Sequence, residues 1–387
     1  MASIRVLYDG WHLVPPASGK ARSPERAPSS PAALQLLAIL ERLPGLDDQS
    51  PSSLRPGPPS EARMGPVEAH LALPGDLPAK LAGLAPASLH VRPAGGRLVW
   101  EQWTLPALAR QAGANLIHLF SDSAPLLSTC PTLCMPCVPL PFAQAGGLTE
   151  RARRSLAAGA AARGLSLLWP ADLPLPAPTA HTAPPCVPGF FQPSLAEPPA
   201  PGGSYILCHA PAGASRADLD ALAAVWSWAG PAIGIDTPLL VLGLAPPQQA
   251  HLREILAVEG QMDTIQFLPE TDPWQIAALY RRARALLHPG PYSPWGDPLL
   301  LALACGLPIA AFETPHTSAR SGPAGYLVPP GDTRALGAAL VTLAVEDSVA
   351  DALAEAARQR PALWGSERFG EALIEAYREV TKTGTWI

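Results

Sequence analysis

The segment from Tyr292 to Gly306, YSPWGDPLLLALACG, constrains the fold of this chain more than any other. Its first half is rich in proline and glycine, which is typical of a turn, whereas LLLALACG is an apolar helix that ends at Gly306. Runs typical of β-strands flank it, ARALLHPG before and LPIAAFE after. Strand, turn, helix and strand form the βαβ unit of a parallel sheet. In such a sheet the turn after the strand faces the ligand crevice, so we expect one wall of any ligand site here.

Strands and helices alternate along both halves of the chain. The expected strands are residues 4–9, 67–74, 89–94, 115–120, 131–140, 165–170, 204–210, 238–245, 264–270, 283–290, 307–313 and 324–332. The expected helices are residues 31–43, 98–113, 148–165, 216–230, 247–260, 272–283 and 299–306, followed by two closing helices. This alternation predicts an α/β protein with two Rossmann-like doubly wound domains that face each other across a cleft.

The length of 387 residues also suits two domains. Residues 193–203, PSLAEPPAPGG, are rich in proline and glycine and predict the linker. We expect the first domain over residues 1–195 and the second over residues 203–363. The last helix, residues 366–380, is expected to cross back onto the first domain.

Composition excludes several classes of partner. The formal net charge is −5 and the pI is about 6.0, so nothing indicates binding to nucleic acid or to an anionic membrane. No apolar run reaches the length of a membrane span, and the N-terminus is predicted to be a first strand instead of a signal peptide. We expect a cytoplasmic protein for which peripheral membrane contact stays open, and the sequence does not determine its oligomeric state.

Three of the six cysteines are closely spaced in the run CPTLCMPC, from Cys130 through Cys134 to Cys137. The spacing C-x3-C-x2-C can hold an iron–sulfur cluster. However, the segment is apolar and strand-like, and no second set of cysteines accompanies it. We therefore interpret these residues as small buried side chains with reduced thiols.

Longer motifs in both halves identify a family resemblance. The second half contains FLPETDPWQIAALYRRARALLHPGPYSPWGDPLLLALACGLPIAAFETP and then AGYLVPPGD, and the first half contains LVWEQWTLPALARQAGANLIHLFSDSAPL and PPCVPGFFQP. These segments resemble GT-B glycosyltransferases of the family-4 type, the second half resembling their donor-binding half. The resemblance covers nearly the whole chain.

This resemblance implies a site for a nucleotide-diphosphate sugar as co-substrate, with no metal ion and no other cofactor. In the family, one glutamate lies near the donor sugar and a second, eight positions later, binds the ribose; those positions are Ser293 and Leu301 here. A leucine cannot accept hydrogen bonds from a ribose diol, and loss of a charged acceptor costs about 1.5–3 kcal/mol. The donor-binding candidates are Ser293, Gly296, Asp297, Pro298, Leu301, Arg216, Leu268 and Glu270.

Other family positions are also changed. The family's arginine and lysine after the first strand of the second domain fall near Pro211 and Arg216, and its histidine–aspartate pair in the first domain falls at Cys137 and Val138. Its third acidic position is close to Ala319. The glycine-rich loop after the first strand is replaced by PPASGKARSPERAPSS, so the candidates in this region are Gly10, Gly19 and Lys20.

Each candidate near the second domain has a simpler interpretation. A carboxylate at Asp297 repels a phosphate unless it turns away, and Ser293 or Asp297 can instead cap the following helix. Arg216 can hold a diphosphate or pair with Asp218 and Asp220, and both interpretations stay open. Lys20 is predicted to be a solvated loop residue.

The histidines and large side chains divide into core and cleft groups. His118 and His288 lie on predicted buried strands and are interpreted as core residues, whereas His209 and His316 flank the cleft and are acid–base candidates. Glu101 is interpreted as structural. The tryptophans at positions 100, 103, 226 and 228 are predicted to pack in the core unless a sugar stacks on one of them.

Three functional hypotheses follow. The first is a retaining glycosyltransferase that transfers a sugar from a nucleotide-diphosphate sugar to a glycan or a lipid-linked acceptor. The second is a catalytically impaired relative that acts as a binding or scaffold protein, because the family's glutamates, histidine and arginine are missing. The third, weaker hypothesis is an epimerase of the same fold, for which we find no acidic and basic residues in the cleft.

Overall fold

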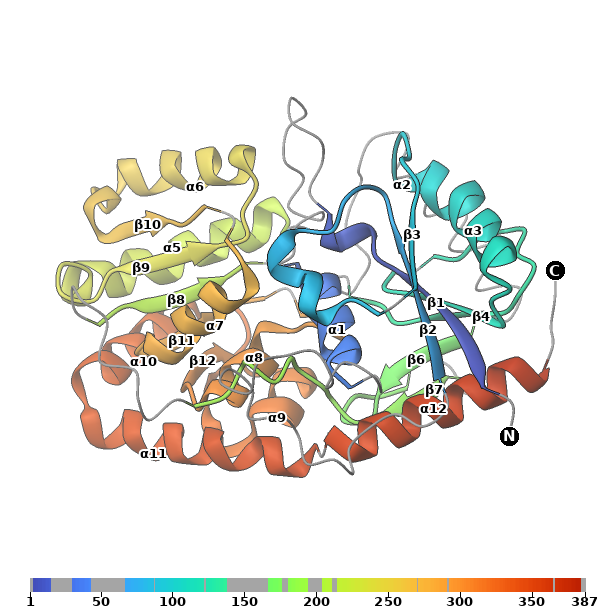
Figure 1. Ribbon diagram of the computed structural model, residues 1–387. Helices are drawn as coiled ribbons and strands as arrows, with labels where there is room; N and C mark the ends of the chain where they lie inside the picture. Colours follow the sequence, from blue (N-terminus) through green and yellow to red (C-terminus); the bar gives the residue numbers. More distant parts are fainter. Residues whose placement is uncertain are drawn as a thin grey trace.

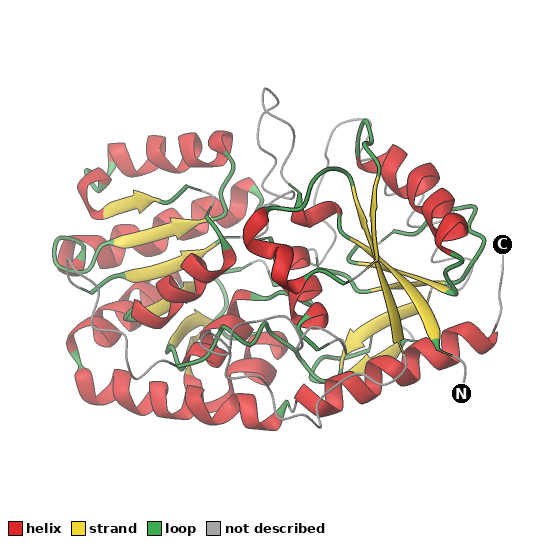
Figure 2. Cartoon of the chain, in the orientation of Figure 1, coloured by secondary structure: helices red, strands yellow, loops and turns green. Residues whose placement is uncertain are grey.

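The computed structural model contains two α/β lobes that lie side by side (Figure 1). It describes residues 3–14, 30–42, 67–86, 88–121, 123–137, 166–175, 180–193, 204–210, 214–269, 271–290, 292–364 and 366–383. Each lobe is built on one parallel sheet with helices packed against it (Figure 2). The predicted α/β class with two doubly wound domains is confirmed.

The first sheet has seven strands in the order β3-β2-β1-β4-β5-β6-β7. All neighbouring strands pair in parallel. The strands are β1 (Ile4–Asp9), β2 (Val67–Leu73), β3 (Ser88–Val91), β4 (Leu116–Leu119), β5 (Thr132–Cys134), β6 (Ser166–Pro170) and β7 (His181–Ala183).

The second sheet has six strands in the order β10-β9-β8-β11-β12-β13, again all parallel. Its strands are β8 (Ile206–His209), β9 (Leu239–Leu242), β10 (Ile265–Phe267), β11 (Ala285–His288), β12 (Ile309–Phe312) and β13 (Gly325–Val328). The four central strands, β9, β8, β11 and β12, are short and buried along their whole length, as expected where helices cover both faces of a parallel sheet.

Several helices begin or end at residues that satisfy their free backbone groups. For example, the Ser30 hydroxyl accepts the backbone N–H of Ala33 at the start of α1, and Gly113 ends α3 in the left-handed conformation. The helices are α1 (Pro31–Leu40), α2 (Arg97–Val99), α3 (Leu105–Ala112), α5 (Arg216–Ile233), α6 (Pro246–Val258), α7 (Pro273–Arg282), α8 (Pro298–Cys305), α9 (Pro315–Ser321), α10 (Thr333–Val345), α11 (Asp347–Gln359) and α12 (Ser366–Thr383). A π-helical segment, Trp100–Thr104, joins α2 to α3.

The structure differs from the predicted elements in four places. The strand β7 was not predicted, and β5 is much shorter than the predicted strand over residues 131–140. The short helix α9 precedes β13, and three helices follow it instead of two. The predicted helix over residues 148–165 and most of the linker, residues 194–203, lie outside the described residues.

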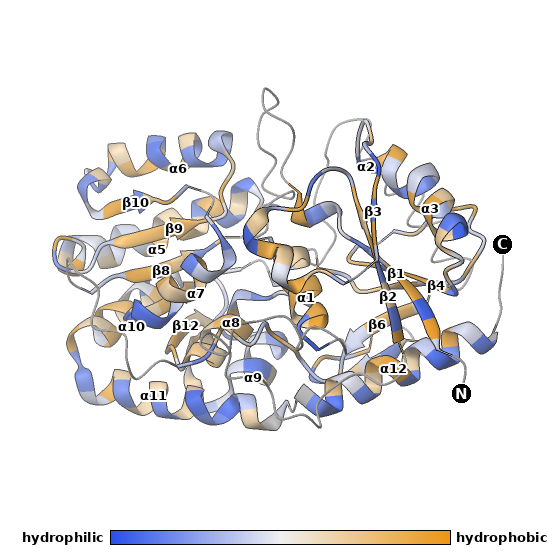
Figure 3. Cartoon of the chain, in the orientation of Figure 1, coloured by the Kyte–Doolittle hydropathy of each residue, from blue (hydrophilic) through white to orange (hydrophobic). Residues whose placement is uncertain are grey.

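The last helix, α12, packs against the first sheet. Along α12, Phe369, Leu373 and Tyr377 are buried in the core of the first sheet. The Tyr377 hydroxyl lies 2.7 Å from His118 Nδ1 and donates to the Tyr8 hydroxyl. Figure 3 shows α12 beneath the strands of the first sheet, and its apolar residues belong to the same core cluster as theirs.

None of the described helices is both long enough and apolar enough to cross a lipid bilayer.

Candidate functional site

The order of the second sheet reverses between β8 and β11. From β8 the chain adds β9 and β10 on one side, and from β11 it adds β12 and β13 on the other. Ligands of doubly wound domains bind at the carboxyl ends of the strands at such a switch point. His209 is the last residue of β8 and His288 is the last residue of β11, so these two histidines mark the candidate site.

The turn after β11 leads directly into helix α8. Asp297 is the N-cap of α8, and its Oδ1 accepts the backbone N–H of Leu299 at 3.0 Å. Pro298 occupies the first helical position, where no N–H is needed. Gly296 has a φ of +67°, in the left-handed region that favours glycine. The predicted capping role of Asp297 is therefore confirmed, and its carboxylate occupies the helix N-terminus where an anion would otherwise bind.

Arg320, from helix α9, holds this turn in place. Its guanidinium is fully buried and donates to Asp297 Oδ2 at 2.8 Å and to the backbone carbonyl of Ser293 at 3.0 Å. It also donates to the backbone carbonyl of Pro294. The opposite edge of the guanidinium donates to Asp172 of the first domain, with Nε 3.2 Å from Oδ2. One buried cation thus bonds to the turn and to the other domain.

The environment of Asp297 keeps its carboxylate charged. Burial raises the pKa of this group, but the hydrogen bond from His316 Nε2 at 2.5 Å and the charge of Arg320 lower it more. The net effect holds the pKa of Asp297 well below its usual range. The negative charge at the start of α8 is therefore neutralised by protein side chains.

The same turn also packs into the first domain. Trp295 is fully buried, lies in the core cluster of the first sheet and donates from Nε1 to the backbone carbonyl of Leu168 at 2.9 Å. A Cβ atom added at Gly296 would lie 2.5 Å from Pro31 Cβ at the start of α1. The two domains are thus in van der Waals contact at the place where the resemblance puts the donor diphosphate.

Three histidines and two tyrosines form contacts in and near this turn. His209 Nδ1 lies 2.8 Å from the Tyr280 hydroxyl, and His288 Nε2 lies 3.7 Å from Asp297 Oδ1. Burial lowers the pKa of His209 to about 4 and that of His288 also to about 4, so both imidazoles are neutral near pH 7. Tyr292 lies between the rings of His288 and His316, with centroid distances of 4.9 and 5.1 Å. Among the described residues, the Tyr292 hydroxyl and His288 Nε2 are buried without a hydrogen-bond partner.

Other donor-site candidates lie away from this turn. Leu301 is fully buried in the core of the second domain with Leu207, Leu242 and Ile276, and not in the crevice. Leu268 is partly buried against the same core. Glu270 lies outside the described residues.

Arg216 is the first residue of α5 and is exposed. It forms no ion pair within the described part of the chain. Asp218 instead caps α5 together with Ser215, and Asp220 lies 2.7 Å from His251. The interpretation of Arg216 as a partner of these aspartates is therefore wrong.

In the first domain the switch point lies between β1 and β4. Gly10 follows β1, and a Cβ atom there would lie 2.6 Å from the Ala72 carbonyl oxygen, so close packing against β2 requires this glycine. Gly19 and Lys20 lie outside the described residues.

Sequence reasoning missed a polar cluster at this switch point. The buried carboxylate of Asp9 accepts hydrogen bonds from Arg97 at 2.7 Å and from the Trp100 indole at 2.8 Å. Glu101 extends the cluster by accepting the Ser123 hydroxyl at 2.6 Å, which agrees with its predicted structural role. The position of Asp9 at the end of the first strand was the signal that could have identified it.

All six cysteines are buried. Burial raises the pKa of Cys130 to about 11 and that of Cys137 well above its usual value, so the thiols stay protonated. Within the described ranges, no three side chains of histidine, cysteine, aspartate or glutamate are arranged to hold a metal ion. The cysteines of the C-x3-C-x2-C run are accordingly packed as small apolar side chains.

Comparison with known proteins agrees with the resemblance. Residues 218–346 match the family described as glycosyl transferases group 1. A D-inositol 3-phosphate glycosyltransferase of Salinispora arenicola is 30% identical over 131 residues, which is 33% of this chain and 29% of that protein. The chain thus aligns with less than a third of the length of this curated relative.

Two solved structures share the fold over the whole chain. The sucrose-phosphate synthase of Thermosynechococcus elongatus superposes with a TM-score of 0.65 at 15% identity, covering 98% of this chain and all of that chain. The Anabaena protein HepE, solved in complex with UDP and glucose, superposes with a TM-score of 0.58 at 16% identity, covering 99% of this chain and 100% of that one. At this identity the superpositions establish the GT-B fold alone.

Proposed function

We propose that the chain, whose residues 218–346 match the glycosyl transferases group 1 family, is a catalytically impaired relative that acts as a binding or scaffold protein. The observation that carries the proposal is the buried ion pair between Asp297 and Arg320 at the start of α8. This pair occupies the helix N-terminus where the resemblance puts the diphosphate. A donor phosphate there would meet a charged carboxylate instead of free N–H groups.

Two further features support the proposal. The ribose-binding glutamate of the family corresponds to Leu301, which is buried in the core and offers no acceptor to a ligand. The turn also contacts Pro31 and reaches the Leu168 carbonyl, both from the first domain. To admit a donor at this position, the two domains would have to separate and break the buried contacts of Trp295 and Arg320.

Calorimetric titration with UDP, GDP and ADP tests this proposal directly. We expect no binding tighter than about 100 μM, which corresponds to roughly −5.5 kcal/mol. Incubation with UDP-glucose and GDP-mannose, each with a glycan acceptor mixture, is expected to release no nucleotide diphosphate above the buffer control. Tighter nucleotide binding together with sugar transfer would overturn the proposal.

Sugar transfer with retention, from a nucleotide-diphosphate sugar to a glycan or lipid-linked acceptor and without a metal ion, is the second candidate. One observation favours it: His288 Nε2 and the Tyr292 hydroxyl are buried at the switch point and have no hydrogen-bond partner among the described residues. Polar atoms that are buried without a hydrogen-bond partner are suited to bind a ligand hydroxyl. Under this candidate, His288→Phe abolishes turnover, whereas under the first there is no turnover to lose.

A further inference from the structure

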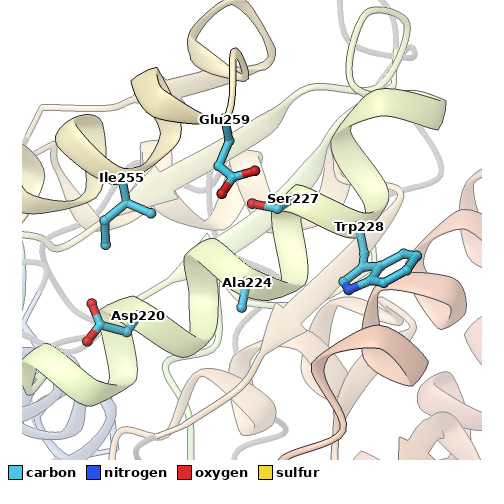
Figure 4. Close-up of a pocket in the computed structure, with 6 residues that line it drawn as sticks. All are labelled: Asp220, Ala224, Ser227, Trp228, Ile255 and Glu259. Atoms are coloured by element: carbon cyan, nitrogen blue, oxygen red, sulfur yellow. The ribbon is translucent and has the colours of Figure 1, made fainter.

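A surface groove of about 580 Å³ lies between α5 and α6 on the second domain (Figure 4). Its lining residues are Asp220, Ala224, Ser227, Trp228, Ile255 and Glu259. None of them belongs to the turn at residues 292–298 or to the strand ends at the switch point. The groove is within the size range of small-molecule sites and is separate from the site described above.

The indole of Trp228 is exposed yet held in position. Its exposed fraction is 51%, although it is one of the largest apolar side chains of α5. The Arg334 guanidinium of α10 lies 4.7 Å from the ring centroid. Gly337 leaves room for the base of this side chain, because a Cβ atom there would be 2.6 Å from Trp228 Cβ. The guanidinium covers one face of the ring, so a sugar ring would stack on the opposite face of this half-exposed indole.

Hydrogen-bonding groups stand along the rest of the groove. Asp220 Oδ1 lies 2.7 Å from His251 Nε2, and a carboxylate has further lone pairs to offer a ligand hydroxyl. The Ser227 hydroxyl donates to the Ala223 carbonyl at 2.9 Å and keeps its acceptor capacity. Glu259 is exposed at the end of α6. Two carboxylates and a hydroxyl beside an aromatic ring are the groups that bind the hydroxyls and the apolar face of a sugar.

The helical spacing gives the groove its length. Asp220, Ala224 and Trp228 follow one another at intervals of four residues along α5, so they share one side of the helix. The distance along the axis from Asp220 to Trp228 is about 12 Å. This length accommodates two linked sugar rings, with one stacked on the indole.

The charges in the groove favour a neutral ligand over a cation. A cation already lies over Trp228, because Arg334 occupies that position, and His251 already contacts Asp220. The groove therefore offers carboxylate and hydroxyl acceptors for hydrogen bonds beside a ring whose cation-binding face is already occupied. We infer that the groove is a saccharide-binding site for a neutral oligosaccharide of two or more rings. The choice of a saccharide as ligand rests on the proposed binding function, whereas the site itself is argued from the residues of the groove.

Saturation-transfer difference NMR on the full chain, without nucleotide, tests the inference. The probes are maltose, cellobiose, chitobiose and mannobiose, each at 10 mM. At least one is expected to receive saturation from the protein, and Trp228→Ala is expected to weaken its binding roughly tenfold. Trp228→Phe should keep most of the affinity, and Asp220→Asn or Glu259→Gln should weaken it severalfold. The matched control is Trp103→Ala, since Trp103 is a 64% exposed tryptophan of the first domain.

A thermal melt of each variant separates loss of binding from loss of folding. The inference would be overturned if none of the four disaccharides receives saturation from the protein. It would also be overturned if Trp228→Ala binds the disaccharide as tightly as the unaltered protein does. Equal losses in Trp103→Ala and Trp228→Ala would do the same. The NMR experiment contains no nucleotide, so its outcome does not depend on whether the chain transfers sugars. Sugar transfer in the turnover assay would overturn the proposed function but not the inference that the groove binds a saccharide.

Discussion

The Arg320 guanidinium donates a hydrogen bond to Asp297 Oδ2 at 2.8 Å, and both side chains are fully buried. The same guanidinium reaches Asp172 of the first domain. In a doubly wound domain the helix N-terminus at the switch point is the place for a ligand anion. In this chain that place is filled by a carboxylate whose counter-charge comes from the protein itself.

Removal of the cation should be strongly destabilising. Arg320→Met leaves the Asp297 and Asp172 carboxylates without their partner, and breaking a buried pair in this way costs about 3–5 kcal/mol. Urea unfolding monitored by circular dichroism measures the change in the free energy of unfolding. A loss below about 1 kcal/mol would show that the network contributes little.

A surface arginine provides the matched control for Arg320. The Arg358 guanidinium lies 2.8 Å from Glu355, but both side chains are about half exposed. Arg358→Met should change the free energy of unfolding by no more than about 0.5 kcal/mol, because exposed ion pairs contribute little. A double-mutant cycle with Asp297→Asn then isolates the coupling between Asp297 and Arg320.

The stability of the protein should fall as the pH is lowered from about 6.5 towards 4. Burial lowers the pKa of His209 to about 4 and that of His288 to about 4, whereas an unfolded histidine titrates near 6.5. The unfolded chain therefore binds more protons in this window, so the free energy of unfolding rises with pH. Each histidine contributes up to about 3 kcal/mol of pH dependence.

Urea unfolding at pH 7.5, 6.5, 5.5 and 4.5 measures this slope. His288→Asn should reduce the slope between pH 6.5 and 4.5, because it removes one group that gains a proton on unfolding. An unchanged slope in His288→Asn would contradict the prediction.

Local sequence patterns were sufficient to predict most of the fold. The βαβ order is visible in residues that are close in the sequence, because apolar strands are followed by helices with recognisable ends. Helix α8, for example, ends at Gly306, and Pro308 follows it. The strand β7 was missed because His181, Thr182 and Ala183 form no apolar run. That strand is stabilised by its pairing with β6 and by the packing of α12 against it. Both contacts join residues that are far apart in the sequence, so no local pattern predicts them.

The candidate site was less predictable than the fold. The capping role of Asp297 could be predicted because it is local. The role of Arg320 could not, since the segment around it resembles an exposed polar helix. Its burial depends on carbonyls of Ser293 and Pro294 and on Asp172, which lies 148 positions earlier in the chain.

Restoring the family's glutamate at position 301 should not restore nucleotide binding. Leu301 is surrounded by apolar side chains, so Leu301→Glu places a charge in the core and should cost several kcal/mol. We expect a large loss in the urea midpoint and no gain in UDP affinity by calorimetry. Leu301→Met, which nearly conserves volume, should cost less than about 1.5 kcal/mol. A folded Leu301→Glu variant with improved UDP affinity would mean that this side chain faces the crevice after all.

Gly296→Ala should destabilise the contact between the domains. The residue has a φ of +67°, which costs a residue with a Cβ atom about 1–2 kcal/mol, and the new Cβ would lie 2.5 Å from Pro31 Cβ. Gly260 has the same φ of +67° but nothing within 4 Å of an added Cβ, so Gly260→Ala carries the backbone strain alone. Small-angle X-ray scattering should therefore show a larger radius of gyration for Gly296→Ala than for Gly260→Ala. If the two variants have the same radius of gyration and lose equal stability, the turn does not hold the domains together. The argument that contacts between the domains block a donor at this position would then lose its structural basis.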